Sequence, residues 1–204
     1  MELIHRIQVT AEKLFSRFGV KSVTMDDVAK EIAISKKTLY KCFRDKESLV
    51  LSTIESHMKE TEEAIEKIIG TEPNAIQQFH LITKYIMSNQ RKLSPSMIYD
   101  LKKYHPNSFQ VFEQHRSTHI VEYLRVNMKL GREMGLYHHD FDTNIIANGF
   151  SMLSFSVFDS IELNSMNIPQ DDLLIEITKY HLRAISTAKG IETINSIQWK
   201  HTNQ

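Results

Sequence analysis

Residues 23–49 have the sequence Val-Thr-Met-Asp-Asp-Val-Ala-Lys-Glu-Ile-Ala-Ile-Ser-Lys-Lys-Thr-Leu-Tyr-Lys-Cys-Phe-Arg-Asp-Lys-Glu-Ser-Leu. This stretch contains two short helix patterns, and each begins after a hydroxyl side chain that is suited to cap it. Thr24 stands three residues before Asp27, the spacing of a capping box with Asp in place of Glu, and Ser35 precedes the second pattern. Two short helices joined by a tight turn, the second rich in lysines and hydroxyls, are typical of a helix-turn-helix. In that motif the second helix enters the major groove of DNA.

The same residues resemble the signature of the TetR (tetracycline-repressor) family. The resemblance covers about the first fifty residues, at Thr24, Val28, Ala29, Ile34, Ser35, Thr38, Leu39, Tyr40, Phe43, Lys46 and Leu49. It implies a DNA-binding domain over residues 1–48, with a recognition helix at about 35–42, and a helical regulatory and dimerisation domain over 49–204. There are three departures from the family pattern: Ala33 at a turn position usually held by Gly, Lys37 where Gly is common, and Cys42 where His or an aromatic residue is usual. An alanine in a left-handed turn would cost about 1–2 kcal/mol.

Basic side chains gather around the predicted recognition helix, although the formal net charge of the whole chain is zero. Residues 1–50 carry a net charge of +3, so the remainder carries −3. A local basic stripe on a neutral protein suits a site-specific DNA binder. Lys36, Lys37 and Thr38 are the expected base readers, and Tyr40 and Lys46 the expected phosphate contacts. The resemblance adds Thr24 at a helix N-terminus; the full predicted set is Thr24, Ser35, Lys36, Lys37, Thr38, Tyr40, Lys41 and Lys46.

Helical periodicity continues through the rest of the chain, with no strand pattern, so we expect an all-α fold of nine helices. Besides the two short helices, we expect helices at residues 2–18, 46–69, 73–90, 95–104, 106–134, 142–163 and 169–189. Gly190 is expected to end the last of them, and the tail to Gln204 to be frayed, with Trp199 as its only candidate anchor. The core shared by the first three helices is expected to contain Phe15, Phe18, Val28, Ile32, Leu39 and Phe43.

The two final predicted helices have more apolar surface than one small core needs. Residues 142–163 are apolar nearly all round, and residues 170–189 are similar. The family resemblance implies that these helices pair with their symmetry mates in a four-helix interface. We therefore expect a homodimer that binds a palindromic double-stranded DNA operator.

Aromatic and methionine side chains between residues 79 and 155 suggest a pocket for a small apolar effector. The candidates are Phe79, Tyr85, Met97, Tyr104, Phe109, Phe112, Tyr123, Met128 and Phe155. The expected mechanism is two-state: ligand favours a tilted helix 46–69, and the two recognition helices then no longer match the operator. A repressor released by its effector is the leading hypothesis. The alternatives are an activator, or a regulator controlled by a protein partner.

Two histidine clusters are candidate metal ligands. His115 and His119 lie four residues apart on one helix, and His138 and His139 precede Asp140 and Asp142. Neither cluster has a cysteine or a third ligand at diagnostic spacing, so no metal site is predicted. Cys42 is interpreted as a small packing residue and not as a redox switch.

Other classes of protein are disfavoured by missing motifs. The sequence has no glycine-rich phosphate loop, nucleophile elbow or metal-hydrolase motif, so we expect neither an enzyme nor a bound cofactor. A single cysteine, a charged N-terminal helix and no apolar run of ~20 residues favour a cytoplasmic location without a membrane partner.

Overall fold

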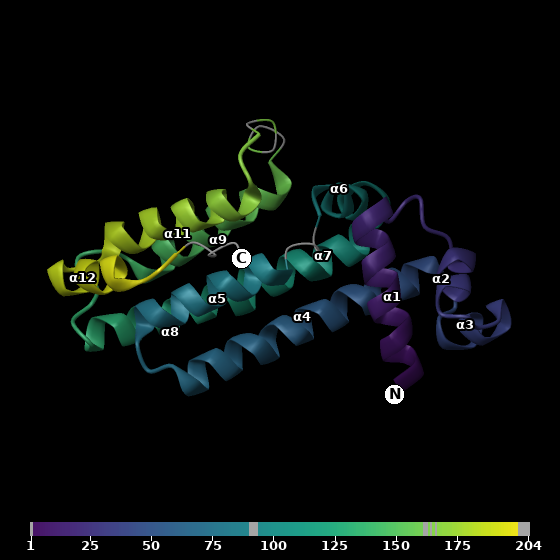
Figure 1. Ribbon diagram of the computed structural model, residues 1–204, viewed down its shortest axis with the longest axis horizontal. Helices are drawn as coiled ribbons and strands as arrows, with labels where there is room; N and C mark the ends of the chain where they lie inside the picture. Colours follow the sequence, from purple (N-terminus) through teal and green to yellow (C-terminus); the bar gives the residue numbers. More distant parts are fainter. Residues whose placement is uncertain (1, 90–93, 161–162, 164, 166, 200–204) are drawn as a thin grey trace. The chain divides into compact units, whose positions relative to one another are not determined.

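The computed structural model describes residues 2–89, 94–160, 163, 165 and 167–199 (Figure 1). Within these residues the secondary structure is helical, with one isolated bridge between Tyr137 and Ser186, so the predicted all-α class is confirmed. No helix in the described part of the chain is both long enough and apolar enough to span a membrane. The α-helices are α1 (Glu2–Phe18), α2 (Met25–Glu31), α3 (Lys36–Cys42), α4 (Lys46–Thr71), α5 (Ala75–Asn89), α6 (Pro95–Tyr104), α7 (Pro106–His115), α8 (Val121–Glu133), α9 (Thr143–Asp159), α11 (Gln170–Ile185) and α12 (Ala188–Ser196).

The chain packs as two compact units. Unit 1 comprises Met1–Glu63 and Asn89–His115, and unit 2 comprises Ala64–Ser88 and Arg116–Gln204. Helices α1 to α3, most of α4, α6 and α7 therefore belong to unit 1. The end of α4 and helices α5, α8, α9, α11 and α12 belong to unit 2. These units are defined by packing. The boundary predicted after residue 48 divides DNA binding from regulation, and it stays a prediction.

Unit 1 is built on the apolar stripe of α1. Ile7, Ala11 and Phe15 are buried, because their spacing places them on one helical face. Gly19 ends the helix with a φ of +80°, a left-handed conformation that glycine adopts without a steric penalty. Phe18 was wrongly predicted as core: it is 52% exposed, and the Arg17 guanidinium lies 4.9 Å from its ring centre. The other predicted core residues are buried (Phe15, Val28, Leu39 and Phe43) or half-buried (Ile32).

Helices α6 and α7 join unit 1 through polar side chains. Ser94 caps α6 and also donates a hydrogen bond from its hydroxyl to the Ser16 carbonyl, at 2.9 Å. The carboxylate of Asp100 accepts the Lys21 backbone N–H at 2.8 Å. These bonds fix α6 against the end of α1 and the loop that leads to α2.

The core of unit 2 brings together α5, α8, α9, α11 and α12. Its centre includes Phe79, Met128, Tyr137 and Leu182, all buried. Helices α9 and α11 lie side by side, as Figure 1 shows. A polar network also crosses this core: the Asn127 amide donates to the Ala75 carbonyl at 2.9 Å.

Several predicted helix ends differ from the structure. The helix expected at 106–134 is divided into α7, a π-helical turn at Arg116–Ile120, and α8. The helix expected at 142–163 ends at Asp159, and 161–162 lie outside the described residues. Residues 90 and 200–204, at the ends of two other predicted segments, are outside them too.

The largest error concerns Gly190. The chain leaves α11 at Ile185, because the Ile185 carbonyl accepts the His138 N–H and Thr187 N–H binds the Leu136 carbonyl. Thr187 then caps the additional helix α12. Gly190 lies inside α12, where a Cβ would be 2.3 Å from the Leu136 carbonyl oxygen. The segment predicted to be frayed is therefore helical to Ser196.

Candidate nucleic-acid interface

The two helices of the motif begin with side-chain caps, as the sequence predicts. The Thr24 hydroxyl accepts the Asp27 N–H at 3.2 Å, and the Asp27 carboxylate accepts the Thr24 N–H at 2.8 Å, which completes a capping box. The Thr24 hydroxyl also donates to the Asp27 carboxylate at 2.6 Å, and this bond, together with the one from the Thr24 N–H, lowers the pKa of the Asp27 carboxyl. Ser35 caps α3 by accepting the Thr38 N–H at 3.0 Å. Both helix starts are thus determined by local sequence.

The turn between α2 and α3 contains a strained alanine. Ala33 has a φ of +56°, in the left-handed region that favours glycine. The turn is closed by hydrogen bonds from Ala33 N–H to the Lys30 carbonyl and from Ile34 N–H to the Ala29 carbonyl. The sequence-based expectation for this position is confirmed. The cost of the strain is offset by the buried contacts of α2 and α3 in the unit 1 core.

Helix α3 divides its residues between the core and the solvent. Leu39 is fully buried and anchors the helix. Lys37, Tyr40 and Lys41 are exposed, and the Tyr40 side chain is 50% exposed, which is unusual for so large an aromatic residue. The exposed face therefore offers two ammonium groups and a phenol, the types of group that contact phosphates and base edges.

Lys36 is placed differently from Lys37. Its ammonium group forms an ion pair with the carboxylate of Asp26 in α2, and this hydrogen bond raises the pKa of Lys36. Lys36 and Lys37 were predicted to have the same role, and Asp26 was not predicted as a partner. The Asp26 carboxylate lies in the first turn of α2, where a helix N-terminus favours negative charge, so its position was visible in the sequence but its partner was not.

Lys46 stands at the start of α4. Its ammonium donates to the Lys21 carbonyl at 3.1 Å, and partial burial lowers its pKa. Asp45 caps the helix by accepting the Ser48 N–H at 2.8 Å. Lys46 therefore lies beside the loop between α1 and α2, where the negative charges of Asp100 and Asp27 oppose the effect of burial on its pKa.

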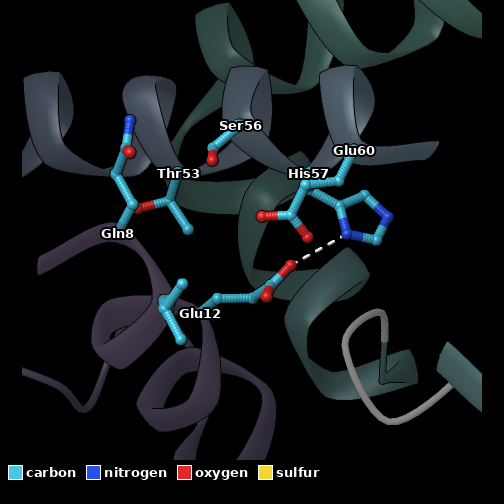
Figure 2. Close-up of a pocket in the computed structure, with 7 residues that line it drawn as sticks. Gln8, Glu12, Thr53, Ser56, His57 and Glu60 are labelled. Carbon is cyan, nitrogen blue, oxygen red and sulfur yellow. Dashed lines mark hydrogen bonds and ion pairs between the residues drawn. The ribbon is translucent and has the colours of Figure 1, made fainter. Parts of the chain in front are cut away.

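A polar seam joins α1 to α4 inside unit 1, and Figure 2 shows it. The Glu12 carboxylate and the His57 imidazole are bonded at 2.8 Å, and both side chains are nearly buried. The Gln8 amide donates to the Ser52 hydroxyl at 2.8 Å and to its carbonyl at 3.1 Å. A second connection is made by Glu47, which is bonded to His105 and accepts the Ser108 hydroxyl at 2.9 Å. These directional bonds hold the first half of α4 against α1 and α7.

The nine residues predicted to line an effector pocket are divided between the two units. Met97, Tyr104, Phe109 and Phe112 belong to unit 1, and Phe79, Tyr85, Tyr123, Met128 and Phe155 to unit 2. Within unit 2, the Phe79 and Tyr123 rings lie 6.4 Å apart. The rings of Phe150 and His181, which were not among the predicted pocket residues, also contact Phe79.

The candidate metal-ligand histidines and Cys42 differ in burial and in their partners. His115 is bonded to Glu62 at 2.8 Å, and His119 is exposed in the π-helical turn. His138 and His139 lie in the segment between α8 and α9, and both are exposed. Cys42 is a half-buried free thiol at the end of α3.

Comparison with known proteins agrees with this geometry. The sequence profile described as bacterial regulatory proteins, tetR family, matches residues 7–53. HTH-type transcriptional regulators of Staphylococcus aureus are 42% identical over 50 residues, which are 24% of this chain and 27% of those proteins. The match to these relatives thus spans about a quarter of their length.

Solved structures extend the likeness in fold. A transcriptional regulator from Cytophaga hutchinsonii aligns with a TM-score of 0.72 at 20% identity, over 92% of this chain and all of that one. A TetR-family regulator from Agrobacterium tumefaciens aligns with a TM-score of 0.74 at 15% identity, over 90% and 97% of the two chains. A transcriptional regulator from Saccharomonospora viridis, solved in complex with choline, has a TM-score of 0.74 at 16% identity, over 91% and 98%.

The fold, the two caps and the exposed face of α3 together define a helix-turn-helix within an all-α protein. Residues 7–53 match the sequence model of bacterial regulatory proteins of the tetR family, and the chain shares its fold with solved structures of transcriptional regulators.

Proposed function

We propose that this protein represses transcription by binding a palindromic operator as a dimer, and that a small effector releases it. The observation that carries the proposal is the exposed face of α3. There Lys37, Tyr40 and Lys41 point away from the core on a helix whose start is capped and whose buried side is fixed by Leu39. The full set of proposed DNA contacts remains Thr24, Ser35, Lys36, Lys37, Thr38, Tyr40, Lys41 and Lys46.

Dimerisation is supported by apolar side chains on the solvent side of α9 and α11. Ile145 is 70% exposed and Met152 65% exposed on α9, and Tyr180 is 71% exposed on α11. Large apolar side chains exposed on two neighbouring helices are typical of an interface between protein chains. A second copy, paired through residues 142–163 and 170–189, would cover this face.

An effector that acts on this regulator must bind the two conformations with different affinities. The aromatic residues of unit 2 support an apolar ligand, and the choline complex of the Saccharomonospora viridis regulator supports a small one. Such a ligand lowers operator affinity only if its preferred conformation misplaces the two copies of α3 relative to successive major grooves.

Operator selection tests the proposal directly. The protein is incubated with random duplexes, the retained pool is sequenced, and the complex is weighed by native mass spectrometry. We expect a palindromic consensus and an even number of protomers. The Lys37→Ala and Tyr40→Ala variants should lose the enrichment, whereas a Lys129→Ala variant, at an exposed position of α8, should keep it. Enrichment that persists in the α3 variants would contradict the assigned interface.

A further inference from the structure

Four aromatic rings from four different helices meet in unit 2. Phe79 of α5 lies 5.3 Å from Phe150 of α9, 5.4 Å from His181 of α11 and 6.4 Å from Tyr123 of α8, measured between ring centres. The Phe150 and His181 rings are stacked at 4.1 Å. An aromatic surface shared by four helices is apolar and specific in shape, because rings prefer offset or edge contacts.

Three polar atoms of this region have no hydrogen-bond partner among the described residues. They are the Tyr123 hydroxyl oxygen, His181 Nε2 and the Thr178 hydroxyl oxygen. His181 is only 7% exposed and Thr178 1%, and the two lie three residues apart on one side of α11. A buried polar group without a partner is costly, so native proteins keep few of them and these need an explanation.

The rest of the same core shows how its polar groups are normally treated. Asn127 donates to the Ala75 carbonyl at 2.9 Å and to the Gln78 side-chain oxygen at 3.1 Å, and it accepts the Tyr137 hydroxyl at 3.3 Å. The Thr83 hydroxyl donates to the Phe79 carbonyl at 2.8 Å. Unpaired buried atoms also occur in unit 2 at His80 Nδ1, Asp171 Oδ1 and Ser186 Oγ. Tyr123 and His181 differ from these because their rings contact Phe79, and Thr178 lies one helical turn from His181.

The unpaired groups are also electrically neutral. Burial lowers the pKa of His181 to about 4, so its imidazole is uncharged at neutral pH. Burial raises the pKa of the Tyr123 hydroxyl, which therefore stays protonated. A neutral imidazole and two hydroxyls both donate and accept hydrogen bonds, but they do not compensate a ligand charge.

We propose that Tyr123, Thr178 and His181 are the hydrogen-bonding groups of the effector site, and that this site takes an uncharged, mainly apolar molecule carrying a hydroxyl or carbonyl group. Phe79 and Phe150 contribute the apolar contacts. The inference rests on the proposed function in placing the effector site in unit 2, and it adds the chemical class of the ligand. It excludes carboxylates and quaternary ammonium ions from the same position.

Calorimetric titration with four probes tests the class of ligand. Phenol has a ring and a neutral hydroxyl, toluene has the same size without the hydroxyl, benzoate carries a negative charge and choline a positive one. At pH 7.5 we expect phenol to bind at least 10-fold more tightly than toluene, and benzoate and choline not to bind. Equal binding of phenol and toluene, tighter binding of either ion, or no binding of phenol at millimolar concentration would overturn the proposal.

Matched variants test the residues. Tyr123→Phe and Thr178→Val remove unpaired hydroxyls, so we expect an unchanged or raised melting temperature in the ligand-free protein. At least one of them should weaken phenol binding about five-fold or more and leave toluene binding unchanged. Tyr137→Phe and Thr83→Val remove paired hydroxyls, and they should lower the melting temperature without a selective loss of phenol. The reverse pattern would show that the unpaired groups serve only packing.

Measuring operator affinity with and without each probe distinguishes this proposal from the broader one, that a small effector releases the protein from its operator. If phenol binds as expected but does not change operator affinity, the site inference stands and ligand-responsive regulation fails. If choline or benzoate binds and releases the operator, regulation by a ligand stands and the neutral class of ligand fails.

Discussion

The Lys36 ammonium in α3 is paired with the Asp26 carboxylate in α2. Asp26 lies in the first turn of α2 and Lys36 in the first turn of α3, so a predicted DNA contact also joins the two helices of the motif. The neighbouring Lys37 is exposed and carries its charge on the face that is offered to DNA. Two adjacent lysines therefore have different roles before any DNA is bound.

Replacement of Asp26 by asparagine should strengthen operator binding. The substitution removes a negative charge from the interface and releases the Lys36 ammonium, and we expect a two- to five-fold gain in affinity, about 0.4–1 kcal/mol, the range of an exposed ion pair. Fluorescence anisotropy with a labelled operator measures it. Glu31→Gln, an exposed carboxylate at the end of α2, serves as the charge-matched control. A loss of affinity in D26N would show instead that Asp26 orients Lys36 toward its DNA contact.

Replacement of Lys37 by alanine should weaken binding and change its salt dependence. If Lys37 contacts a phosphate, the slope of log K against log salt should fall by about 1, because one fewer counterion is released. If it reads a base, the loss should be concentrated at one operator position, at about 1–3 kcal/mol. Titrations at several salt concentrations, repeated with single-base operator variants, distinguish the two. An unchanged affinity on every duplex would remove Lys37 from the interface.

The hydroxyl of Tyr40 should matter for DNA and not for folding. Because the side chain is half exposed, Tyr40→Phe should leave the melting temperature within about 1 °C, while loss of one phosphate hydrogen bond weakens operator affinity about 3- to 10-fold. Tyr99→Phe is the control, since Tyr99 is an equally exposed tyrosine in α6. Undiminished binding in a mobility-shift titration would contradict the role of Tyr40.

The strained turn offers a stabilising substitution. Ala33→Gly relieves a left-handed alanine, worth about 1–2 kcal/mol, but it raises the entropy of the unfolded chain by about 0.4–1 kcal/mol. We expect a net gain of roughly 0.5–1 kcal/mol in the free energy of unfolding, measured by urea denaturation. Gly135→Ala is the converse control, because Gly135 has a φ of +69° with open space around its Cβ position, and it should be destabilised. A less stable A33G protein would mean that the turn relaxes when alanine is present.

Local features of this fold were predictable because their causes lie within a few residues. The Thr24–Asp27 capping box, the Ser35 cap and the left-handed Ala33 follow from side chains and backbone geometry at fixed short spacing. The prediction for Gly190 was wrong because a glycine is needed there to leave room for the Leu136 carbonyl, which is more than fifty residues away in sequence. A glycine after an apolar run can end a helix or can allow close packing, and the local sequence is the same in both cases.

The candidate sites show the same limit. The exposed lysines of α3 were evident from their register, but the Asp26 partner of Lys36 depends on how α2 and α3 are placed in space. His181 and Thr178 were not selected, since a histidine and a threonine on an amphipathic helix are usually exposed or paired. Burial without a partner distinguishes both residues, and the His181 ring also lies against Phe79 and Phe150.

Burial of His181 should make unit 2 sensitive to acid. Its pKa is about 4 in the folded protein and about 6.5 in an unfolded chain, so below pH 6.5 the unfolded state binds a proton that the folded state does not accept until about pH 4. Stability is therefore fully present above pH 6.5 and falls as the pH decreases toward 4, by about 2 kcal/mol at pH 5. Urea unfolding followed by the fluorescence of Trp199, which lies in unit 2, measures this at pH 7.5, 6 and 5.

The variant His181→Phe identifies the group responsible. It keeps a ring between Phe79 and Phe150 but has no titrating nitrogen, so most of the acid-induced loss should disappear. Part of the slope should remain, because burial, with a smaller effect of the Lys84 charge, also lowers the pKa of His80. A double variant with His80→Phe should remove that remainder. If the H181F protein loses as much stability between pH 7.5 and 5 as the unmodified chain, another group controls the acid response and His181 is not held neutral by its surroundings.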